Sequence, residues 1–487
     1  MTAPKKLVLA VIDSLKPELL DQAIEEGRAP ALQALRDRGT YVADCVSCFP
    51  SVTPVASACI ATGAGPDEHL IPSMNWYHRG EERYVEYGSS MPATRAFGVF
   101  RSLYDTVYNM NMAHLSRSLR TVFEHLDDAD LRTACTTYLI YRGRYRHEPW
   151  AQARLRRLAE AAQFNHAVWG PRELFYADLF DSRNTGCTST LGMPGQRDRH
   201  TACVGAYLVE HDLFDFMLFS LPDNDTWSHR YGPDAQVRSI AEADRALERI
   251  MHVHGGTGPF LDDHAVIVMS DHSQTPVEQR VDLEEALGSW RVLQPSDVAP
   301  AEAELAVCPA ARSAMLYVLG EHDREEKVAR AARDLEPADG VDLIARRSNA
   351  DALVWSKRGE LRFRAGGELE DLRGGRWTVE GEHAALDLTV EGSRVTSEAY
   401  PDALGRLWSA LQCSRAGDVL VSAELGYEFV DWGGADHVGG GSHGSLHRGD
   451  SLGVLLTSGV DMPERQQWSI ADATDLVLRH FSLSSSR

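Results

Sequence analysis

Three runs of mostly apolar residues constrain the fold of this chain most strongly. They span residues 7–12, 214–221 and 265–269, and each is followed within a few residues by an aspartate. Runs without regular polar alternation are typical of strands buried on both faces of a parallel sheet. Pro17 opens a helix pattern after the first run, and 234–253 repeats apolar residues at helical spacing. This alternation predicts an α/β fold, with a mostly parallel sheet sandwiched by helices.

With 487 residues, the chain is long enough for several domain-sized units. Its hydrophobic content of 43% permits a sizeable core. We predict a catalytic core formed by 1–275 and 418–487, with a cap-like excursion at about 76–210. From about residue 276 the pattern changes to short alternating β segments interrupted by glycines. We therefore predict that 276–417 is an inserted, β-rich α+β lid or cap.

The charge balance argues against a nucleic-acid polymer as partner. Lys and Arg number 49 and Asp and Glu 71, so the net charge is 49 − 71 = −22. Broad nucleic-acid surfaces need basic patches, whereas divalent cations need carboxylates. The composition is therefore compatible with bound divalent cations, and it leaves the oligomeric state unassigned.

Neither the hydropathy nor the cysteines indicate a membrane or an oxidising compartment. No stretch approaches 18 apolar residues, and the run at 7–12 is too short for a signal sequence. The eight cysteines are scattered, which suits a reducing compartment. Cys45 and Cys48 form a C-x-x-C motif without a second pair at zinc-finger spacing. We expect a cytoplasmic protein without a membrane span or a structural zinc ribbon.

The stretch 49–63 begins a helix near Thr53. Pro54 suits the first helical position, and a threonine before it suits the N-cap. Free N–H groups at such a helix end form a binding site for anions. Two interpretations of Thr53 are open at this point. Its hydroxyl is either an ordinary helix cap or a nucleophile that faces a phosphate.

Aspartates and histidines lie where the predicted strands end. Asp13 follows the first run, Asp225 and His229 follow the second, and Asp271 and His272 follow the third. His443 lies in the glycine loop 439–444. Each alone is compatible with a turn or cap. Because the crevice of an open α/β sheet lies at the carboxyl ends of its strands, these side chains are expected to converge. Asp and His are zinc ligands, so the set indicates a catalytic metal site.

Six sequence blocks occur in the order found in one family. They are 11–13, 49–63, 66–71, 225–233, 270–272 and 441–444. In these blocks the chain resembles the alkaline phosphatase superfamily and, within it, the type I phosphodiesterase/nucleotide pyrophosphatase family. The resemblance implies an alkaline-phosphatase-like core. It also implies a hydrolase that cleaves a phosphodiester or pyrophosphate bond of a small, nucleotide-like phosphate.

The resemblance also implies the site residues. Two zinc ions are expected, although other divalent metals are possible. Asp225, His229 and His443 would hold one ion, and Asp13, Asp271 and His272 the other, with Thr53 alongside. Thr53 would attack phosphorus and form a phospho-threonine, which water then hydrolyses. Asn75 would donate a hydrogen bond to a nonbridging phosphate oxygen.

Several departures from the family pattern leave the substrate undefined. Ser14 stands where the family has glycine after the first ligand, and Leu70 replaces the glycine of a His-Gly pair. Ser228 stands where a glycine usually precedes the histidine. None of these changes removes a ligand. Trp76 and Tyr77, just after Asn75, are equally suited to stacking on a substrate or to anchoring a loop.

Alternatives remain within and outside catalysis. The same Thr53 site would serve a phosphomonoesterase or a phosphonate (C–P) hydrolase, and a non-catalytic binding protein on this fold is less favoured because every ligand position is filled. A sulfatase would need an arginine that the stretch beginning at Cys48 lacks. The phosphoglycerate mutase branch is expected to use a serine nucleophile with manganese. The basic run 141–147 is either a solvated loop or a contact to an anionic substrate.

Overall fold

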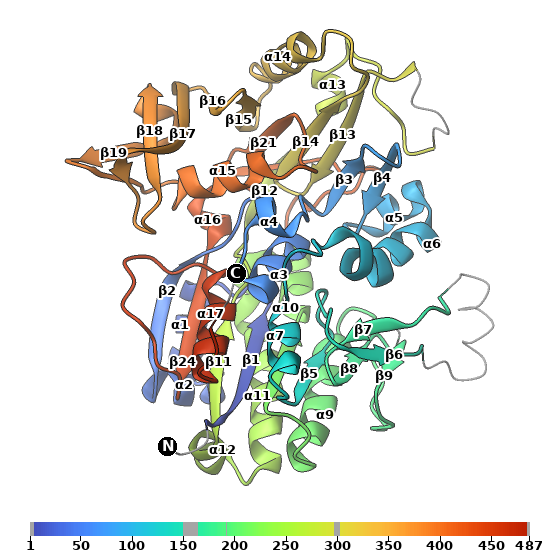
Figure 1. The fold of residues 1–487 in the computed structure, drawn as a ribbon, viewed down its shortest axis with the longest axis vertical. Helices are drawn as coiled ribbons and strands as arrows, with labels where there is room; N and C mark the ends of the chain where they lie inside the picture. The colour runs from blue at the N-terminus through green and yellow to red at the C-terminus, as the bar shows by residue number, and fades with distance from the viewer. Residues whose placement is uncertain (1–3, 150–163, 191, 297–301, 485–487) are drawn as a thin grey trace.

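The main β-sheet lies between two layers of helices, as the computed structural model shows for residues 4–149, 164–190, 192–296 and 302–484 (Figure 1). It has eight strands in the order β2-β24-β11-β1-β10-β5-β8-β9. The strands are β1 (Lys6–Ile12), β2 (Thr40–Val46), β5 (Thr133–Thr136), β8 (Glu173–Tyr176), β9 (Phe180–Asp181), β10 (Phe216–Leu221), β11 (His264–Met269) and β24 (Leu452–Ser458). The predicted α/β class is confirmed.

Parallel pairing brings the three predicted strands together at the centre of this sheet. β1 pairs in parallel with β10 and with β11. Ile12 lies opposite Leu221, and Val11 lies opposite Met269, so the three strands end at nearly the same level. β24 pairs antiparallel with β11 and β2, which makes this edge of the sheet antiparallel.

Residues that alternate along β1 contribute to two separate cores. Val8 and Ala10 belong to the core on the face covered by α11, whereas Leu7 and Leu9 belong to the core that contains α3. The first layer comprises α1 (Pro17–Glu25), α2 (Pro30–Asp37), α9 (Arg197–Glu210), α11 (Gln236–Val253) and α12 (Thr257–Asp263). The other comprises α3 (Thr53–Thr62), α7 (Val122–Asp128) and α17 (Asp472–His480). Both faces of the central strands are therefore buried, as their apolar sequences require.

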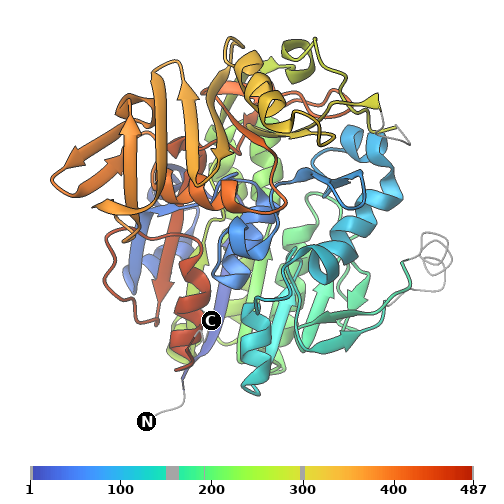
Figure 2. The same cartoon turned by 45° about the horizontal axis from the view of Figure 1, so that its top comes forward.

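A second, mostly antiparallel sheet of nine strands lies beyond one end of the main sheet, coloured gold to orange in Figures 1 and 2. Its strands are β13 (Leu305–Ala310), β14 (Ser313–Val318), β15 (Val341–Ser348), β16 (Asp351–Ser356), β17 (Gly359–Glu370), β18 (Arg376–Gly381), β19 (Leu388–Glu391), β20 (Arg394–Ser397) and β21 (Val419–Ala423). It is accompanied by α13 (Leu283–Ala286), α14 (Arg324–Leu335), α15 (Ala403–Gln412) and the 3₁₀ turn His383–Leu386.

Shorter elements connect these units. A small sheet joins β12 (Thr275–Val281) to β22 (Gly426–Phe429) and β23 (Gly441–Ser442). The remaining elements are α4 (Pro66–His69), β3 (Asn75–His78), β4 (Arg83–Glu86), α5 (Met91–Phe97), α6 (Val99–Tyr104), the π-helix Asp105–His114, β6 (Tyr145–His147), β7 (Val168–Gly170), α10 (Asp223–Tyr231), the 3₁₀ turn Pro233–Ala235 and α16 (Arg448–Ser451).

Two predicted boundaries differ from the structure. β21 lies in the second sheet between β14 and β15, so that sheet extends past the expected boundary at residue 418. Part of the excursion 76–210 is not cap-like, because β5, β8 and β9 complete the main sheet. The reason is common to both cases. The local sequence of a short apolar strand does not indicate which sheet the strand joins, because its partner strands are distant in sequence.

The scatter of the cysteines suits a reducing compartment, but the structure shows that not all of them are free thiols. Cys187 and Cys203 are joined by a disulfide, and the other six, which include Cys45 and Cys48, are buried and free. Among the described residues, the groups able to hold a metal contain no cysteine. No helix in the described part of the chain is both long and apolar enough to cross a membrane.

Candidate metal centre and active site

Thr53 is the first residue of α3 rather than its cap. Val52 is the N-cap, with extended backbone (φ −122°, ψ 146°), and the helix has no side-chain cap. The N-cap predicted at Thr53 is therefore wrong, because the N-cap lies one residue earlier, at Val52. Its hydroxyl oxygen instead lies 3.2 Å from Nε2 of His272. The Thr53 hydroxyl at the start of α3 therefore accepts no capping hydrogen bond from a backbone N–H.

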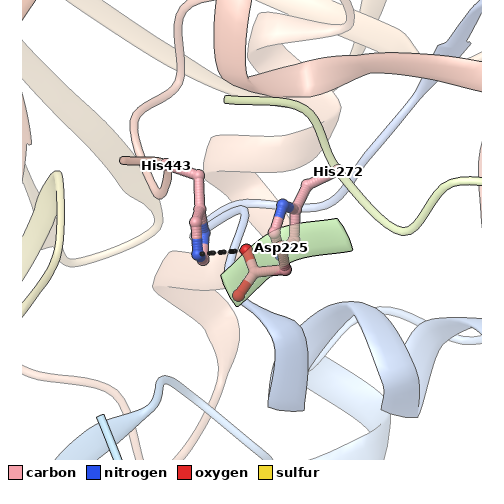
Figure 3. A group of neighbouring side chains, drawn as sticks. All are labelled: Asp225, His272 and His443. Carbon is pink, nitrogen blue, oxygen red and sulfur yellow. Dashed lines mark ion pairs between the residues drawn. The ribbon is translucent and has the colours of Figure 1, made fainter. Parts of the chain in front are cut away.

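The structure gathers the predicted metal ligands at the carboxyl ends of β1, β10 and β11. One group able to hold a metal comprises Asp13, Asp271 and His272. The other comprises Asp225, His272 and His443, drawn in Figure 3. His229, on the same helix as Asp225, has Nε2 at 3.4 Å from Asp225 Oδ1. His272 is common to both groups, so the two sets of ligands are contiguous.

All three histidines present Nε2 to the carboxylates because a backbone carbonyl faces the other ring nitrogen. Nδ1 lies 2.8 Å from Gly441 O in His229, 2.8 Å from Ser51 O in His443 and 3.3 Å from Ser273 O in His272. A carbonyl can only accept a hydrogen bond, so each Nδ1 carries the proton and each Nε2 keeps its lone pair. Burial lowers the pKa of each ring to about 4, which keeps all three neutral at pH 7.

The distances between donor atoms fit a tetrahedral metal site. Nε2 of His443 lies 3.6 Å from Asp225 Oδ1, and Nε2 of His272 lies 3.4 Å from Asp271 Oδ2 and 3.7 Å from Asp13 Oδ1. Ligands at about 2.0–2.1 Å from a tetrahedral zinc ion are about 3.3 Å apart. Imidazole nitrogens and carboxylate oxygens are also the ligands that zinc takes. The residues present therefore fit the expected group.

The three buried carboxylates crowd one another. Burial, and then the nearby charges of Asp271 and Asp225, raise the pKa of Asp13 well above its usual value. Burial also raises the pKa of Asp271, to about 6. Burial opposes ionisation of Asp225 too, but His229, His443 and His272 bring its pKa below the usual value. A divalent cation would relieve this crowding.

Ser14 connects the two ligand sets. Its hydroxyl donates to Asp225 Oδ1 (2.7 Å), and its backbone N–H donates to Asp271 Oδ1 (3.1 Å). Gln274 Nε2 donates to the same Asp225 oxygen at 2.5 Å. Ser14 has φ +59°, a conformation that favours glycine. The left-handed backbone explains why glycine suits this position, and the serine adds a hydrogen bond that glycine cannot supply.

Replacing Ser14 is expected to weaken zinc binding without unfolding the protein. Both Ser14→Gly and Ser14→Ala remove the donor to Asp225, and loss of such an outer partner lowers metal affinity about 10–100-fold. Ser14→Gly also relieves the left-handed strain, so it should be more stable than Ser14→Ala by about 1 kcal/mol. Chelator competition and urea unfolding measure the two effects. Unchanged zinc affinity in both variants would contradict the role of the hydroxyl.

The loop of His443 packs against the helix of His229. A Cβ atom on Gly440 would lie 2.0 Å from the carbonyl oxygen of His229, so only glycine fits there. The next residue, Gly441, supplies the carbonyl that orients His229. The glycine loop therefore positions two ligands, one directly and one through its backbone.

Sequence reasoning missed His437 in the same region. Its ring stacks on His229, with ring centres 4.1 Å apart, and its Nδ1 lies 2.7 Å from Glu428 Oε1. Glu428 also accepts a hydrogen bond from Ser442. His437 stands six residues before His443. This closeness to His443 in sequence is the one signal that could have indicated His437, and it does not predict the stacking on His229.

Asn75 is fully buried in β3, and its amide nitrogen donates to Pro309 O at 3.2 Å. Within the described part of the chain its Oδ1 has no hydrogen-bond partner. The phosphate contact of Asn75 therefore stays a prediction.

The rings of Trp76 and Tyr77 are only 1% and 3% exposed. Trp76 meets His114 edge-on, and Tyr77 packs against Tyr84 and Tyr317. Of the two interpretations left open, this packing favours loop anchoring over stacking on a substrate.

The basic run 141–147 is engaged with acidic residues. Arg142 pairs with Glu124 at 3.1 Å, and Arg144 pairs with Asp128 at 2.8 Å. These ion pairs bind the run to α7. Of the two interpretations, they favour a structural role over substrate binding.

Comparison with solved structures shows the fold. Phosphonoacetate hydrolase from Sinorhizobium meliloti 1021, in complex with phosphonoformate, matches with TM-score 0.58 and 17% identity over 99% of this chain and 96% of that chain. Human ectonucleotide pyrophosphatase/phosphodiesterase 5 matches with TM-score 0.58 and 11% identity over the same shares. An inactive form of the murine protein in complex with AMP has the same values. No curated protein is similar enough in sequence to match.

The family comparison is more specific than the structural one. The family described as type I phosphodiesterase/nucleotide pyrophosphatase matches residues 7–446, which include all the metal-site residues described above. This family consists of hydrolases that act on phosphoester bonds and are typically metal-dependent. The chain therefore belongs to the type I phosphodiesterase/nucleotide pyrophosphatase family of the alkaline phosphatase superfamily.

Proposed function

We propose that this protein is a zinc-dependent hydrolase that cleaves a phosphodiester or pyrophosphate bond of a small, nucleotide-like organic phosphate through a phospho-threonine intermediate. One observation carries the proposal. The Thr53 hydroxyl, which caps no backbone amide, lies 3.2 Å from His272 Nε2 and next to two contiguous sets of zinc-type ligands. A hydroxyl needs activation to act as a nucleophile, and this position supplies it.

The side chains divide into two sets of ligands. Asp225, His229 and His443 would hold one zinc ion, and Asp13, Asp271 and His272 the other, with Thr53 alongside. The bound ions would supply the positive charge that stabilises the threonine alkoxide and the leaving oxygen. Thr53 Oγ1 would form the new bond to phosphorus as the bond from phosphorus to the leaving oxygen breaks, which releases an alcohol or a phosphate. Water would then cleave the bond between Thr53 Oγ1 and phosphorus and restore the hydroxyl.

The end of α3 contributes less by free amides than its sequence suggested. Pro54 has no N–H, and the N–H groups of Val55 and Ala56 both donate to Val52 O at 3.0 Å. The helix dipole still favours negative charge at Thr53. We therefore assign stabilisation of the phosphate mainly to the metal ions that these residues would hold and to the helix dipole, rather than to an array of backbone donors.

A substrate panel with metal analysis tests the proposal. Purified protein should contain two zinc ions per chain and cleave bis-p-nitrophenyl phosphate faster than p-nitrophenyl phosphate. A preference for the monoester would favour a phosphomonoesterase, and cleavage of phosphonoacetate in preference to both would favour a C–P hydrolase. If the protein contained no metal and cleaved none of the diester, the monoester and the phosphonate, the non-catalytic binding protein would be favoured.

Zinc affinity is expected to fall as the pH is lowered below about 6. The raised pKa of Asp271, about 6, means that this ligand is protonated below that pH, and the pKa of Asp13 beside it is also raised, so zinc has to displace protons from both carboxylates. The histidines stay neutral down to about pH 4, so they do not limit binding in this range. Chelator competition between pH 5 and 8 measures the affinity. Calorimetry in two buffers counts the protons released, and a flat profile would contradict the assignment.

We also propose a cytoplasmic location, which the six buried free cysteines support. The bond between Cys187 and Cys203 would have to be reduced there, which makes the location testable. Thiol labelling in intact cells should find both residues reduced if the protein lies in a reducing compartment. Finding the pair oxidised would argue for an oxidising location instead.

A further inference from the structure

A groove lies behind the helix that carries two of the predicted metal ligands. It has a volume of about 470 Å³ and is lined by residues of α9, α10 and α11, which lie close together in Figure 1. Asp225 and His229, at i and i+4 on α10, face the metal centre. Trp227, Arg230 and Tyr231 line the groove from the same helix. The two sites therefore share α10 but use different faces of it.

Five arginines line this groove. They come from three helices and are Arg199, Arg230, Arg238, Arg245 and Arg249. Arg245 pairs with Glu242. Within the described residues, the other four form no ion pair with a carboxylate. In a chain of net charge −22, such a cluster of unpaired arginines leaves a local excess of positive charge.

The other acidic side chains of the groove do not neutralise this excess. Asp223 pairs with Arg197, which is not among the five, at 2.9 Å, and it accepts the backbone N–H of Asp198. Asp198 is buried. Burial, and then the charge of Asp223, raise its pKa to about 8, so it carries little charge at pH 7. Glu242, which pairs with Arg245, is also close enough to Arg199 and Arg238 for their charges to lower its pKa. One carboxylate therefore serves three of the five arginines, and the groove keeps a net positive charge.

Two of these arginines are held by aromatic rings. Arg238 lies over Trp227, 4.9 Å from the ring centre, and Arg230 lies over Tyr231 at 5.1 Å. A guanidinium that stacks on a ring keeps its in-plane N–H donors available for an anion. Small side chains, Ala202 and Ala246, also line the groove and leave it open.

We propose that this groove is a second site, separate from the metal centre, that binds a small molecule bearing phosphate groups. Guanidinium groups recognise phosphate through paired, charge-assisted hydrogen bonds, and several arginines can share the oxygens of one or two phosphates. The volume is in the range of small-molecule sites. The assignment does not depend on the reaction at Thr53.

The first test measures protection of individual arginines by methylenediphosphonate. This probe resembles pyrophosphate, but its P–C–P bridge replaces the P–O–P anhydride that a hydrolase could cleave. Phenylglyoxal modification of the zinc-loaded protein is followed by peptide mapping. We expect the probe to slow modification of Arg199 and Arg249 at least fivefold relative to sodium chloride of equal ionic strength. Arg101, exposed on α6, is the control and should not change. Equal slowing at Arg101, or no protection at the groove, would overturn the proposal.

Calorimetry on a paired variant is the second test. The zinc-loaded protein should bind methylenediphosphonate in two events, one at the metal centre and one at the groove. Arg199→Gln/Arg249→Gln should lose one event and keep the other, whereas Arg101→Gln should keep both. A single event that persists in the double variant would overturn the proposal. Malonate, a dicarboxylate of similar span, is the comparison ligand, and binding equal to that of the diphosphonate would overturn the assignment to phosphate.

Discussion

Thr53→Ala is expected to lower kcat/KM on a phosphodiester by at least about 10³-fold, because removal of a nucleophile leaves only the residual catalysis due to the remaining site. Zinc content should stay near that of the wild type, since Asp13, Asp271 and His272 remain. The side chain caps no backbone amide, so the stability of α3 should change little. Steady-state kinetics, metal analysis and thermal unfolding of one preparation measure all three quantities.

Thr53→Ser is the matched control, because it keeps a hydroxyl at the same position. It should retain measurable turnover and form a phosphorylated residue that acid quenching and mass spectrometry place at position 53. Undiminished activity of Thr53→Ala would refute the phospho-threonine route, whatever the substrate is. A phosphorylated Ser variant with an inactive Ala variant would support it directly.

Asp225→Asn is expected to release one of two zinc ions and to abolish most activity. Asp225 is the point on which His229 and His443 converge, at 3.4 and 3.6 Å, and it accepts hydrogen bonds from Ser14 and Gln274. Loss of an outer partner lowers metal affinity by about 10–100-fold, so loss of a direct ligand should lower it by more than about 100-fold. Competition with a chromogenic chelator measures the loss.

Asp234→Asn is the matched control, since it makes the same chemical change at an exposed position shortly after α10. It should bind two zinc ions and keep full activity. If Asp225→Asn also bound two ions with wild-type affinity, the assignment of Asp225 as a ligand would be wrong. A variant that fails to fold would be recognised by its circular dichroism before its metal content is interpreted.

Local sequence was sufficient for the parts of the site that end strands. The apolar runs of β1, β10 and β11 identify buried parallel strands, and the shared edge of such a sheet brings Asp13, Asp225 and Asp271 together. The order of the six blocks identified the family, which the match over 7–446 confirms. These features are legible because parallel pairing and strand-end crevices follow general rules.

Other features depended on contacts between distant segments. In the sequence Ser14 is only a departure from the family pattern, whereas in the structure its hydroxyl lies 2.7 Å from Asp225, which is 211 residues away. The stacking of His437 on His229 and the disulfide of Cys187 with Cys203 have the same origin. No local pattern encodes which residues approach one another across a fold.

The sequence by itself determined the fold class, the family and the chemical types of the side chains that could hold a metal, because each follows from short-range patterns in a known order. Only the tertiary structure decided that Thr53 begins α3 instead of capping it and that three carbonyls turn Nε2 of His229, His272 and His443 toward the carboxylates. It also placed unpaired arginines behind α10. The physical reason is that hydrogen-bond geometry, burial and charge depend on neighbours that the chain supplies from remote positions.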